Sequence, residues 1–133
     1  MATRKSRIEF QDIYPGGPFY SRGVRAGNML FISGTTARGS TAEGGVPIDQ
    51  LLMILDRISK MVAAEGVKPS DILKLTTYVT KRADWWPVPE EHTMVYREFF
   101  GSELPTNSMI EISALVEDGL DIEIEAIAIL DET

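Results

Sequence analysis

The chain contains no cysteine and only one histidine among its 133 residues. The absence of cysteine excludes disulfides, thiolate metal sites and a cysteine nucleophile. A single histidine without any cysteine also cannot build the usual zinc site. We therefore expect no metal centre, and the lack of cysteine is compatible with a reducing compartment.

Positive charge is scarce as well. Lysine and arginine together number 13, against 20 aspartates and glutamates, so the formal net charge is −7. A protein that binds nucleic acid needs a basic surface to neutralise phosphates, so this balance argues against nucleic acid as a partner. The one dense basic run is Arg4, Lys5 and Arg7, which we interpret as a solvated terminus.

Long apolar runs and several well-known motifs are also missing. No run approaches the roughly 20 apolar residues of a membrane span, and the first residues lack the apolar centre of a signal peptide. There is no phosphate-binding loop, dinucleotide fingerprint or Gly-x-Ser-x-Gly nucleophile elbow. A length of 133 residues suits a single domain over residues 1–133. We expect a cytoplasmic protein without a membrane segment.

Hydrophobic periodicity predicts six strands and two helices. Pro47 suits the start of the first helix, while Gly66 and Gly101 suit the positions after the two helix ends. The predicted elements are strands at Arg7–Phe10, Tyr20–Val24 and Asn28–Ser33, a helix at Ile48–Glu65, a strand at Ile72–Thr80, a helix at Pro87–Phe100, and strands at Asn107–Val116 and Leu120–Leu130. Turns at Ala26-Gly27 and at Glu117-Asp118-Gly119 predict two hairpins, the second joining the last two strands.

Two helices cannot cover both faces of a sheet of this size. The strand at 72–80 alternates, with Leu73, Leu75, Thr77 and Val79 on one face. The last strand has apolar residues on both faces: Ile122, Ile124, Ala126 and Ala128 on one, and Ile127 and Ile129 beside Glu125 on the other. An uncovered apolar sheet face normally marks an interface, so the pattern predicts a homo-oligomer.

Glu125 is the most informative carboxylate in the sequence. It lies in the middle of the last strand and shares its face with apolar residues. A carboxylate in a partly apolar site is a candidate general acid or base, and the alternative is a rim residue paired with an arginine. Asn107, Met109 and Glu111 share one face of the neighbouring strand. If that face joins Glu125, a small polar cleft results.

Aromatic residues and the single histidine offer weaker candidates. Trp85 and Trp86 precede the second helix and either anchor that helix or stack on a ligand, with packing the favoured role. Tyr20 follows a Gly-Pro turn and either lines a pocket or packs. His92 lies on the apolar stripe of the second helix, and we interpret it as a packed helix residue rather than a base.

Several segments resemble one family in the right order. They are Gly17-Pro18-Phe19-Tyr20-Ser21, the VRAGNMLFISG stretch from Val24 to Gly34, Asp49-Gln50 at the first helix, Tyr96-Arg97-Glu98-Phe99-Phe100, and the closing Ile122-Glu123-Ile124-Glu125-Ala126. On these motifs the chain is identified as a member of the Rid family (reactive intermediate deaminases, YjgF/UK114, also described as L-PSP endoribonuclease-like).

The resemblance implies an α+β, chorismate-mutase-like single domain, with a mixed sheet and two helices on one of its faces. It also implies a homotrimer with ligand clefts between subunits. Active members hydrolyse an imine or enamine metabolite to a carbonyl compound and ammonia without a metal or organic cofactor. By the same resemblance Glu125 positions the attacking water. The implied substrate-binding residues are Tyr20, Ser33, Gly34, Thr35, Asn107, Ser108 and Met109.

The departures from the family pattern concern substrate binding. Asn107 stands where the family has its substrate-binding arginine, Met109 where it has a cysteine, and Thr93 where it has a helix asparagine. An amide lacks the charge-assisted fork of a guanidinium, so small carboxylates such as 2-aminoacrylate are disfavoured and a neutral or larger imine is expected.

Two other readings stay open beside the hydrolase. The same trimer could bind a metabolite without turnover, and the endoribonuclease activity ascribed to some relatives is the less favoured alternative because of the acidic balance. Arg22, Arg25 and Arg38 are the candidates for replacing the missing cation.

Overall fold

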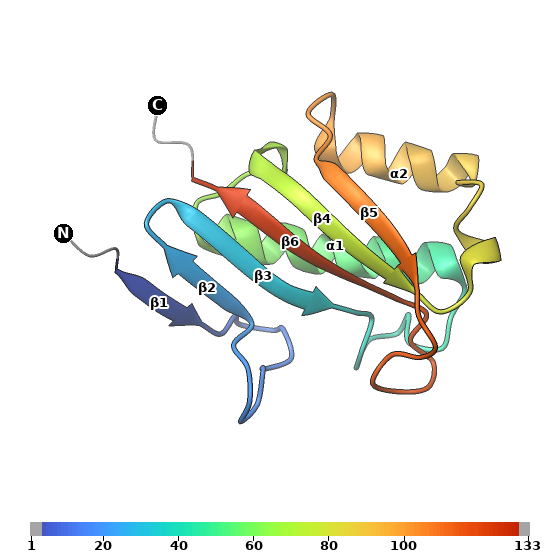
Figure 1. The fold of residues 1–133 in the computed structure, drawn as a ribbon, viewed down its shortest axis with the longest axis horizontal. Coiled ribbons are helices and arrows are strands. Elements are labelled where there is room, and N and C mark those ends of the chain that lie inside the picture. The colour runs from blue at the N-terminus through green and yellow to red at the C-terminus, as the bar shows by residue number, and fades with distance from the viewer. Residues whose placement is uncertain (1–3, 131–133) are drawn as a thin grey trace.

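The computed structural model describes residues 4–130 and consists of one six-stranded sheet with two helices. Both helices lie behind the sheet in Figure 1, so one sheet face is covered and the other is open. The elements are β1 (Lys5–Ile8), β2 (Gly23–Ala26), β3 (Met29–Thr35), α1 (Pro47–Ala64), η1 (Pro69–Asp71), β4 (Ile72–Val79), η2 (Arg82–Asp84), α2 (Glu90–Phe100), β5 (Thr106–Glu111) and β6 (Ile122–Ile129). The mixed α+β arrangement with two helices on one face is confirmed.

The first helix begins and ends where the sequence predicts. Pro47 takes an initial helical position, and Gly66 follows the end with a φ of 76°, a left-handed conformation that glycine adopts without steric cost. Helical spacing predicts one apolar stripe on this helix, and its members pack toward the sheet except for Leu52, which is exposed. The stripe consists of Ile48, Leu51, Leu52, Leu55, Ile58 and Val62. The second helix starts at Glu90 rather than at Pro87, because the residues before it form the short η2 turn and an irregular segment.

The strand order is β1-β2-β3-β6-β4-β5. The predicted hairpin of β2 and β3 is confirmed, with antiparallel pairing that includes Ala26 with Met29. The predicted hairpin of the last two strands is wrong, because β4 lies between β5 and β6. β5 runs parallel to β4, and parallel neighbours need a long crossover connection. The α2 segment supplies that crossover, which a reading of local turn signals does not reveal.

The core lies between α1 and the covered face of the sheet. In β6 the burial alternates as predicted, with Ile122, Ile124, Ala126 and Ala128 buried. β4 follows its predicted alternation from Leu75 onward, but Leu73 is 45% exposed. The pairing of β4 with β6 shifts between Ile72 and Lys74, so the irregularity turns Ile72 into the core in place of Leu73.

Gln50 joins three segments at one end of the core. Its side chain is completely buried and donates to the carbonyl oxygens of Gly45 and Gly119 at 3.0 and 3.3 Å and to the Asp121 carboxylate at 2.9 Å. Its own carbonyl oxygen accepts the Asp121 N–H at 2.9 Å. These bonds fix the polar 39–45 loop and the entrance to β6 on the first turn of α1.

We therefore expect Gln50→Ala to lower the free energy of unfolding by roughly 2–4 kcal/mol, because several buried polar groups lose their partner together. Urea titration followed by circular dichroism measures the loss. Lys60→Ala is the matched control in the same helix, since the exposed Lys60–Asp56 ion pair contributes less than about 0.5 kcal/mol. Equal losses in the two variants would contradict this role for Gln50.

Candidate functional site

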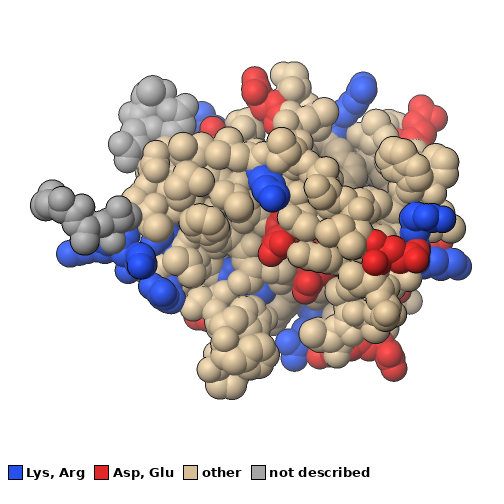
Figure 2. All heavy atoms as spheres, in the orientation of Figure 1, with Lys and Arg blue, Asp and Glu red and all other residues tan. Residues whose placement is uncertain are grey.

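The open face of the sheet carries a group of polar side chains in its middle. We call the surface formed by the following residues the open face: Phe31, Thr76, Tyr78, Glu123, Glu125 and Ile127. Figure 2 shows this side of the molecule, where uncharged atoms dominate and acidic groups gather near the middle. The Tyr78 hydroxyl donates to Glu125 Oε1 at 3.0 Å. This bond, followed by burial, raises the pKa of Tyr78, so the phenol stays protonated and the carboxylate stays oriented.

A cavity of about 270 Å³ lies beside Glu125 on the same face. Its other walls include Val24 and Phe31 from β2 and β3, Thr76 from β4, and Ile127 from β6. The carboxylate therefore borders a partly apolar recess with a hydroxyl opposite, as the register of Thr76 with Glu125 requires. Such a setting can hold a small molecule or a water next to a carboxylate.

Glu123 lies two residues before Glu125 on the same face and is half-buried. Burial raises its pKa, the charge of Glu125 raises it further, and the Arg22 guanidinium opposes the rise. Gly34 leaves the space that this carboxyl occupies, because a Cβ atom on Gly34 would lie 2.5 Å from Glu123 Cδ. The two carboxyl groups thus have different environments, the pattern by which acid and base roles separate.

Arg22 supports the backbone beside Glu123 from within the core. It is completely buried and donates to the Gly34 carbonyl at 2.8 Å, the Ser33 carbonyl at 3.3 Å and the Thr35 hydroxyl at 2.8 Å. The same guanidinium stands 4.8 Å from the centre of the Tyr14 ring, a cation–π contact. The end of β3 is therefore fixed by the two terminal nitrogens of a buried guanidinium, whose Nε has no hydrogen-bond partner among the described residues.

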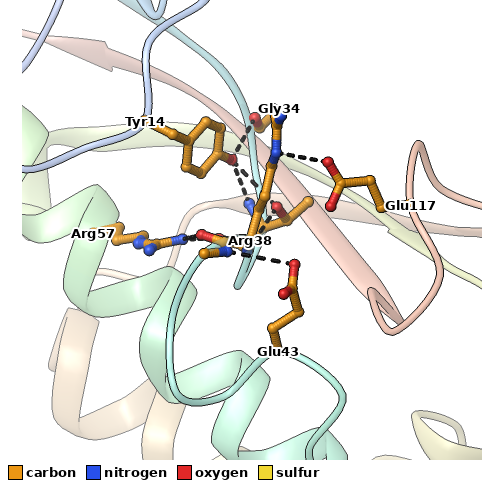
Figure 3. Close-up of polar contacts among 8 residues, drawn as sticks. Tyr14, Gly34, Arg38, Glu43, Arg57 and Glu117 are labelled. Carbon is orange, nitrogen blue, oxygen red and sulfur yellow. Dashed lines mark hydrogen bonds and ion pairs between the residues drawn. The ribbon is translucent and has the colours of Figure 1, made fainter.

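Figure 3 shows the neighbouring contacts around Tyr14. Its hydroxyl accepts the Thr36 N–H at 2.8 Å, while Arg57 donates to the carbonyl oxygens of Thr36 and Arg38 at 2.7 and 2.8 Å. Burial lowers the pKa of Arg57, and the nearby charge of Arg22 adds to that effect. These contacts hold residues 36–38 in one conformation next to the site.

Three arginines were candidates to replace the substrate-binding arginine that the family has at position 107, and all three have other partners in the chain. Arg22 binds the end of β3, Arg25 donates to the Glu65 carbonyl at 3.1 Å, and Arg38 pairs with Glu117 at 2.8 Å. The bond recorded for Asn107 is to Thr77, whose hydroxyl donates to Asn107 Oδ1 at 2.9 Å. None of these three arginines has a recorded contact with Asn107, whereas Arg82 and Arg97 line the same cavity as Asn107.

A second cavity, of about 590 Å³, lies between α2, β4, β5 and the segment before α2. We call it the α2 cavity. Its lining comprises Leu75, Val79, Arg82, Trp85, Trp86, Val88, His92, Thr93, Tyr96, Arg97, Phe100, Leu104, Pro105, Asn107, Met109 and Glu111. The β5 face predicted to carry Asn107, Met109 and Glu111 together is confirmed, and it borders this cavity.

The α2 cavity has buried aromatic walls. Trp85 is 1% exposed, and its ring lies 5.1 Å from that of His92. Burial lowers the pKa of His92 and raises the pKa of Tyr96 to about 12, so both side chains are uncharged at neutral pH. Trp85 Nε1 and the Tyr96 hydroxyl have no hydrogen-bond partner among the described residues. The interpretation of His92 as a packed helix residue agrees with its burial.

The predicted site residues are divided between the open face, the surroundings of the buried Arg22 and the α2 cavity. Glu125 and Ser33 border the open-face cavity, Gly34 contacts Glu123, and Ser108 is in register with Thr76. Tyr20 lies near Arg22, at 5.9 Å between the guanidinium carbon and the ring centre, and Thr35 is buried against Arg22. Asn107 and Met109 instead face the α2 cavity.

The face of β5 that carries Asn107 therefore does not join Glu125 within one chain. Tyr78 and Glu123 are the site residues that the sequence analysis left without a role. The alternation of β4 placed Tyr78 on the open side, but only strand pairing brings it next to Glu125.

No helix within residues 4–130 is long and apolar enough to cross a membrane. The same range holds no group of three or more His, Asp or Glu side chains placed to bind a metal ion.

The fold and the site define a small α+β protein with a half-covered sheet, two carboxylates on its open face and a largely apolar cavity between α2 and the edge strand β5. Comparisons identify the family. Residues 11–130 match the family model described as Endoribonuclease L-PSP. A RutC family protein of Pyrococcus horikoshii is 37% identical over 118 residues, which are 86% of this chain and 88% of the relative.

Two further relatives agree. The 2-iminobutanoate/2-iminopropanoate deaminase of Escherichia coli is 35% identical over 116 residues, which are 85% of this chain and 88% of the relative. The crystal structure of E. coli TdcF with bound serine has a TM-score of 0.78 and 28% identity, covering 93% of this chain and 98% of that one. The chain belongs to the Rid (YjgF, L-PSP) family.

We expect Glu123→Gln to stabilise the protein at neutral pH. The folded-state pKa of Glu123 is raised above its ordinary 4.5, so folded chains hold this proton at pH values where unfolded chains have lost it. The free energy of unfolding therefore falls as the pH rises from the ordinary glutamate pKa to the raised pKa of folded Glu123. The glutamine side chain does not ionise, so the variant does not lose this stability. The gain in melting temperature should be present at pH 7 and shrink as the pH falls below the ordinary glutamate range.

Melting curves of wild type and variant from pH 3.5 to 8 measure this difference. Glu98→Gln, at an exposed position of α2, is the control and should track the wild type across the range. A Glu123→Gln variant that is less stable than wild type at pH 7 would show that the ionised carboxylate is favoured in the folded state.

Proposed function

We propose that the protein hydrolyses a reactive imine or enamine metabolite to a carbonyl compound and ammonia, with Glu125 orienting the attacking water. The observation that carries the proposal is the bond from the Tyr78 hydroxyl to Glu125 beside the open-face cavity, which holds a carboxylate in place at a recess. Membership of the family supports the reaction class, since the E. coli relative is named as an imine deaminase. The E. coli TdcF structure holds serine, so that relative binds a small metabolite.

The reaction needs no redox partner. Water adds to the imine carbon and gives one proton to a base while the nitrogen takes up a proton, which forms a carbinolamine. Its hydroxyl then loses its proton as the carbonyl forms, the carbon–nitrogen bond breaks, and the nitrogen takes up a second proton and leaves as ammonia. Glu125 is suited to accept the proton from water because Tyr78 orients its carboxylate. We give Glu123 the role of returning a proton to the departing nitrogen, because its carboxyl lies two residues from Glu125 on the same face and burial raises its pKa. We assign no metal or organic cofactor to the reaction.

A complete site with predicted residues of both the open face and the α2 cavity needs a second copy of the chain. Glu125 and Asn107 lie on opposite faces of one sheet, so a cleft that contains both takes one group from each of two subunits. The proposal is a homotrimer of chorismate-mutase-like domains, each spanning residues 1–133, with open faces turned inward and Tyr20, Ser33, Gly34, Thr35 and Ser108 around the cleft. It also assigns the protein to the cytoplasm.

Phe31 tests this assembly. Phe31 is 41% exposed on the open face of the single chain, so the Phe31→Asp variant should still fold. Burying the aspartate charge between subunits is unfavourable, so the variant should not assemble. We expect a mass near 14.8 kDa for the variant, and about three times that value for wild type, by light scattering. The control is Val116→Asp, at an apolar loop position that is 79% exposed, which should assemble like wild type. A monomeric wild type would contradict the proposed trimer.

The activity is tested by ammonia release from imines made in situ by an amino-acid oxidase. We expect Glu125→Gln to lower kcat/KM by about 10²–10⁴, the usual contribution of a general base, and Tyr78→Phe to lower it by roughly tenfold because the carboxylate loses its orienting bond. Glu98→Gln is the exposed control. A folded wild-type trimer that accelerates no imine would favour the alternative, a trimer that binds metabolites without turnover, which the Asn107, Met109 and Thr93 departures favour.

A further inference from the structure

The α2 cavity has the size of a ligand pocket. Its volume of about 590 Å³ lies within the range of roughly 300–1,000 Å³ that small-molecule sites occupy. The walls are largely apolar and come from β4, β5 and α2, among them Leu75, Val79, Phe100, Leu104 and Met109. The open-face cavity beside Glu125 is smaller, at about 270 Å³, so the larger apolar volume lies on the Asn107 side of β5.

The buried walls of the α2 cavity carry no charged side chain. The charged residues of its lining are Arg82, Arg97 and Glu111, and all three are solvent-exposed. His92 and Tyr96 are buried in neutral form at pH 7, as the lowered pKa of His92 and the pKa of about 12 for Tyr96 show. Away from these exposed side chains, a charged group placed against the buried walls, such as Trp85 and Phe100, would lose its hydration, which is unfavourable.

Aromatic rings add a preference for flat or branched apolar groups. Tyr96 and Phe100 stack with ring centres 6.4 Å apart, and Trp85 packs on His92 behind them. Rings of this kind bury large areas and contact a guest ring or branched chain over its whole surface. Asn107 stands at the β5 wall with its carbonyl oxygen bound to Thr77, so its amino group is free to donate to a polar atom of the guest.

We propose that the α2 cavity receives the side chain of the substrate, and that the preferred imine therefore carries an uncharged branched or aromatic side chain rather than a methyl or a carboxylate-bearing one. The reaction itself rests on the proposed function, in which Glu125 of a second copy lies across the cleft. The side-chain preference rests on the α2 cavity alone and can be measured without turnover.

Three 2-oxo acids isolate the effect of the side chain, because they share the carbonyl and carboxylate groups. 4-Methyl-2-oxopentanoate has a branched apolar side chain, 2-oxoglutarate has a charged one of similar length, and pyruvate has a methyl. We expect 4-methyl-2-oxopentanoate to bind at least about tenfold more tightly than either, because several additional apolar carbons leave water. Isothermal calorimetry on the full-length protein measures the affinities.

Intrinsic fluorescence locates the bound acid. The chain has two tryptophans, Trp85 and Trp86, and both line the α2 cavity. Binding of 4-methyl-2-oxopentanoate should therefore change the tryptophan emission with the same midpoint as the calorimetric titration. Binding without any change in emission would overturn the proposed location, and so would the failure of 4-methyl-2-oxopentanoate to bind at about 10 mM, a weak limit for so large a pocket.

A pair of matched variants tests the cavity. Met109→Trp fills the α2 cavity from its β5 wall and should abolish the preference for the branched acid. Met53→Trp makes the same substitution on α1, at a position that borders other recesses, and should retain it. Both variants are first checked for wild-type melting temperature. Met109→Phe, which still adds volume, replaces Met109→Trp if the larger side chain unfolds the protein, and it should reduce the preference to a few-fold.

The two proposals fail in different ways. Suppose that wild type hydrolyses no imine but still binds 4-methyl-2-oxopentanoate about tenfold more tightly than the other two acids. The proposed hydrolysis is then wrong, and the assignment of the α2 cavity as a side-chain site is supported. If leucine-derived and alanine-derived imines are hydrolysed with equal kcat/KM and the three acids bind equally, the hydrolysis stands and the side-chain assignment falls. Retention of the preference in Met109→Trp also overturns the assignment. Glu125→Gln should lose turnover and keep the binding preference.

Discussion

The alternation of β6 is the constraint on which the rest of the structure depends. This strand lies between β3 and β4, so its two faces must serve two different surroundings at once. Ile122, Ile124 and their even-numbered neighbours pack beneath α1, while Glu123 and Glu125 stand on the open face. Because the side-chain period of a strand is two, a shift of one residue would bury both carboxylates in the core and expose the isoleucines. The register that builds the core therefore also builds the candidate site.

Most of the charge near the site serves the fold. Arg22 donates hydrogen bonds to the carbonyl oxygens of Ser33 and Gly34. Arg57 donates to the carbonyl oxygens of Thr36 and Arg38. These guanidinium groups shape the end of β3 and leave Glu123 with only partial compensation for its burial. A site that recognised a small carboxylate would need such a cation at Asn107, where the structure has an amide bound to Thr77. The contacts of Arg22 and Arg57 thus explain how the end of β3 and residues 36–38 are held.

The sheet separates the two kinds of chemistry. The open face offers carboxylates and the Tyr78 hydroxyl, which can handle water and protons, whereas the covered face ends in an apolar cavity that suits a side chain. Opposite faces of one sheet cannot bind the same small molecule. A homotrimer with clefts between its subunits, as proposed, is one arrangement that would bring the two together, and the half-exposed Phe31 gives an apolar reason for copies of the chain to associate.

The sequence by itself determined the elements that depend on local chemistry. The apolar stripe of α1, the glycine beyond its end, the β2–β3 hairpin and the alternation of β6 all follow from residue spacing and turn residues, and each is present. Family motifs identified Glu125 and the β5 residues as site candidates. Only the tertiary structure decided that β4 separates β5 from β6, that Ile72 replaces Leu73 in the core, and that Asn107 and Glu125 face opposite ways. Strand order and register depend on contacts between residues far apart in the chain, which no local pattern encodes, so the partners of Glu125 became visible only when β4 was paired beside β6.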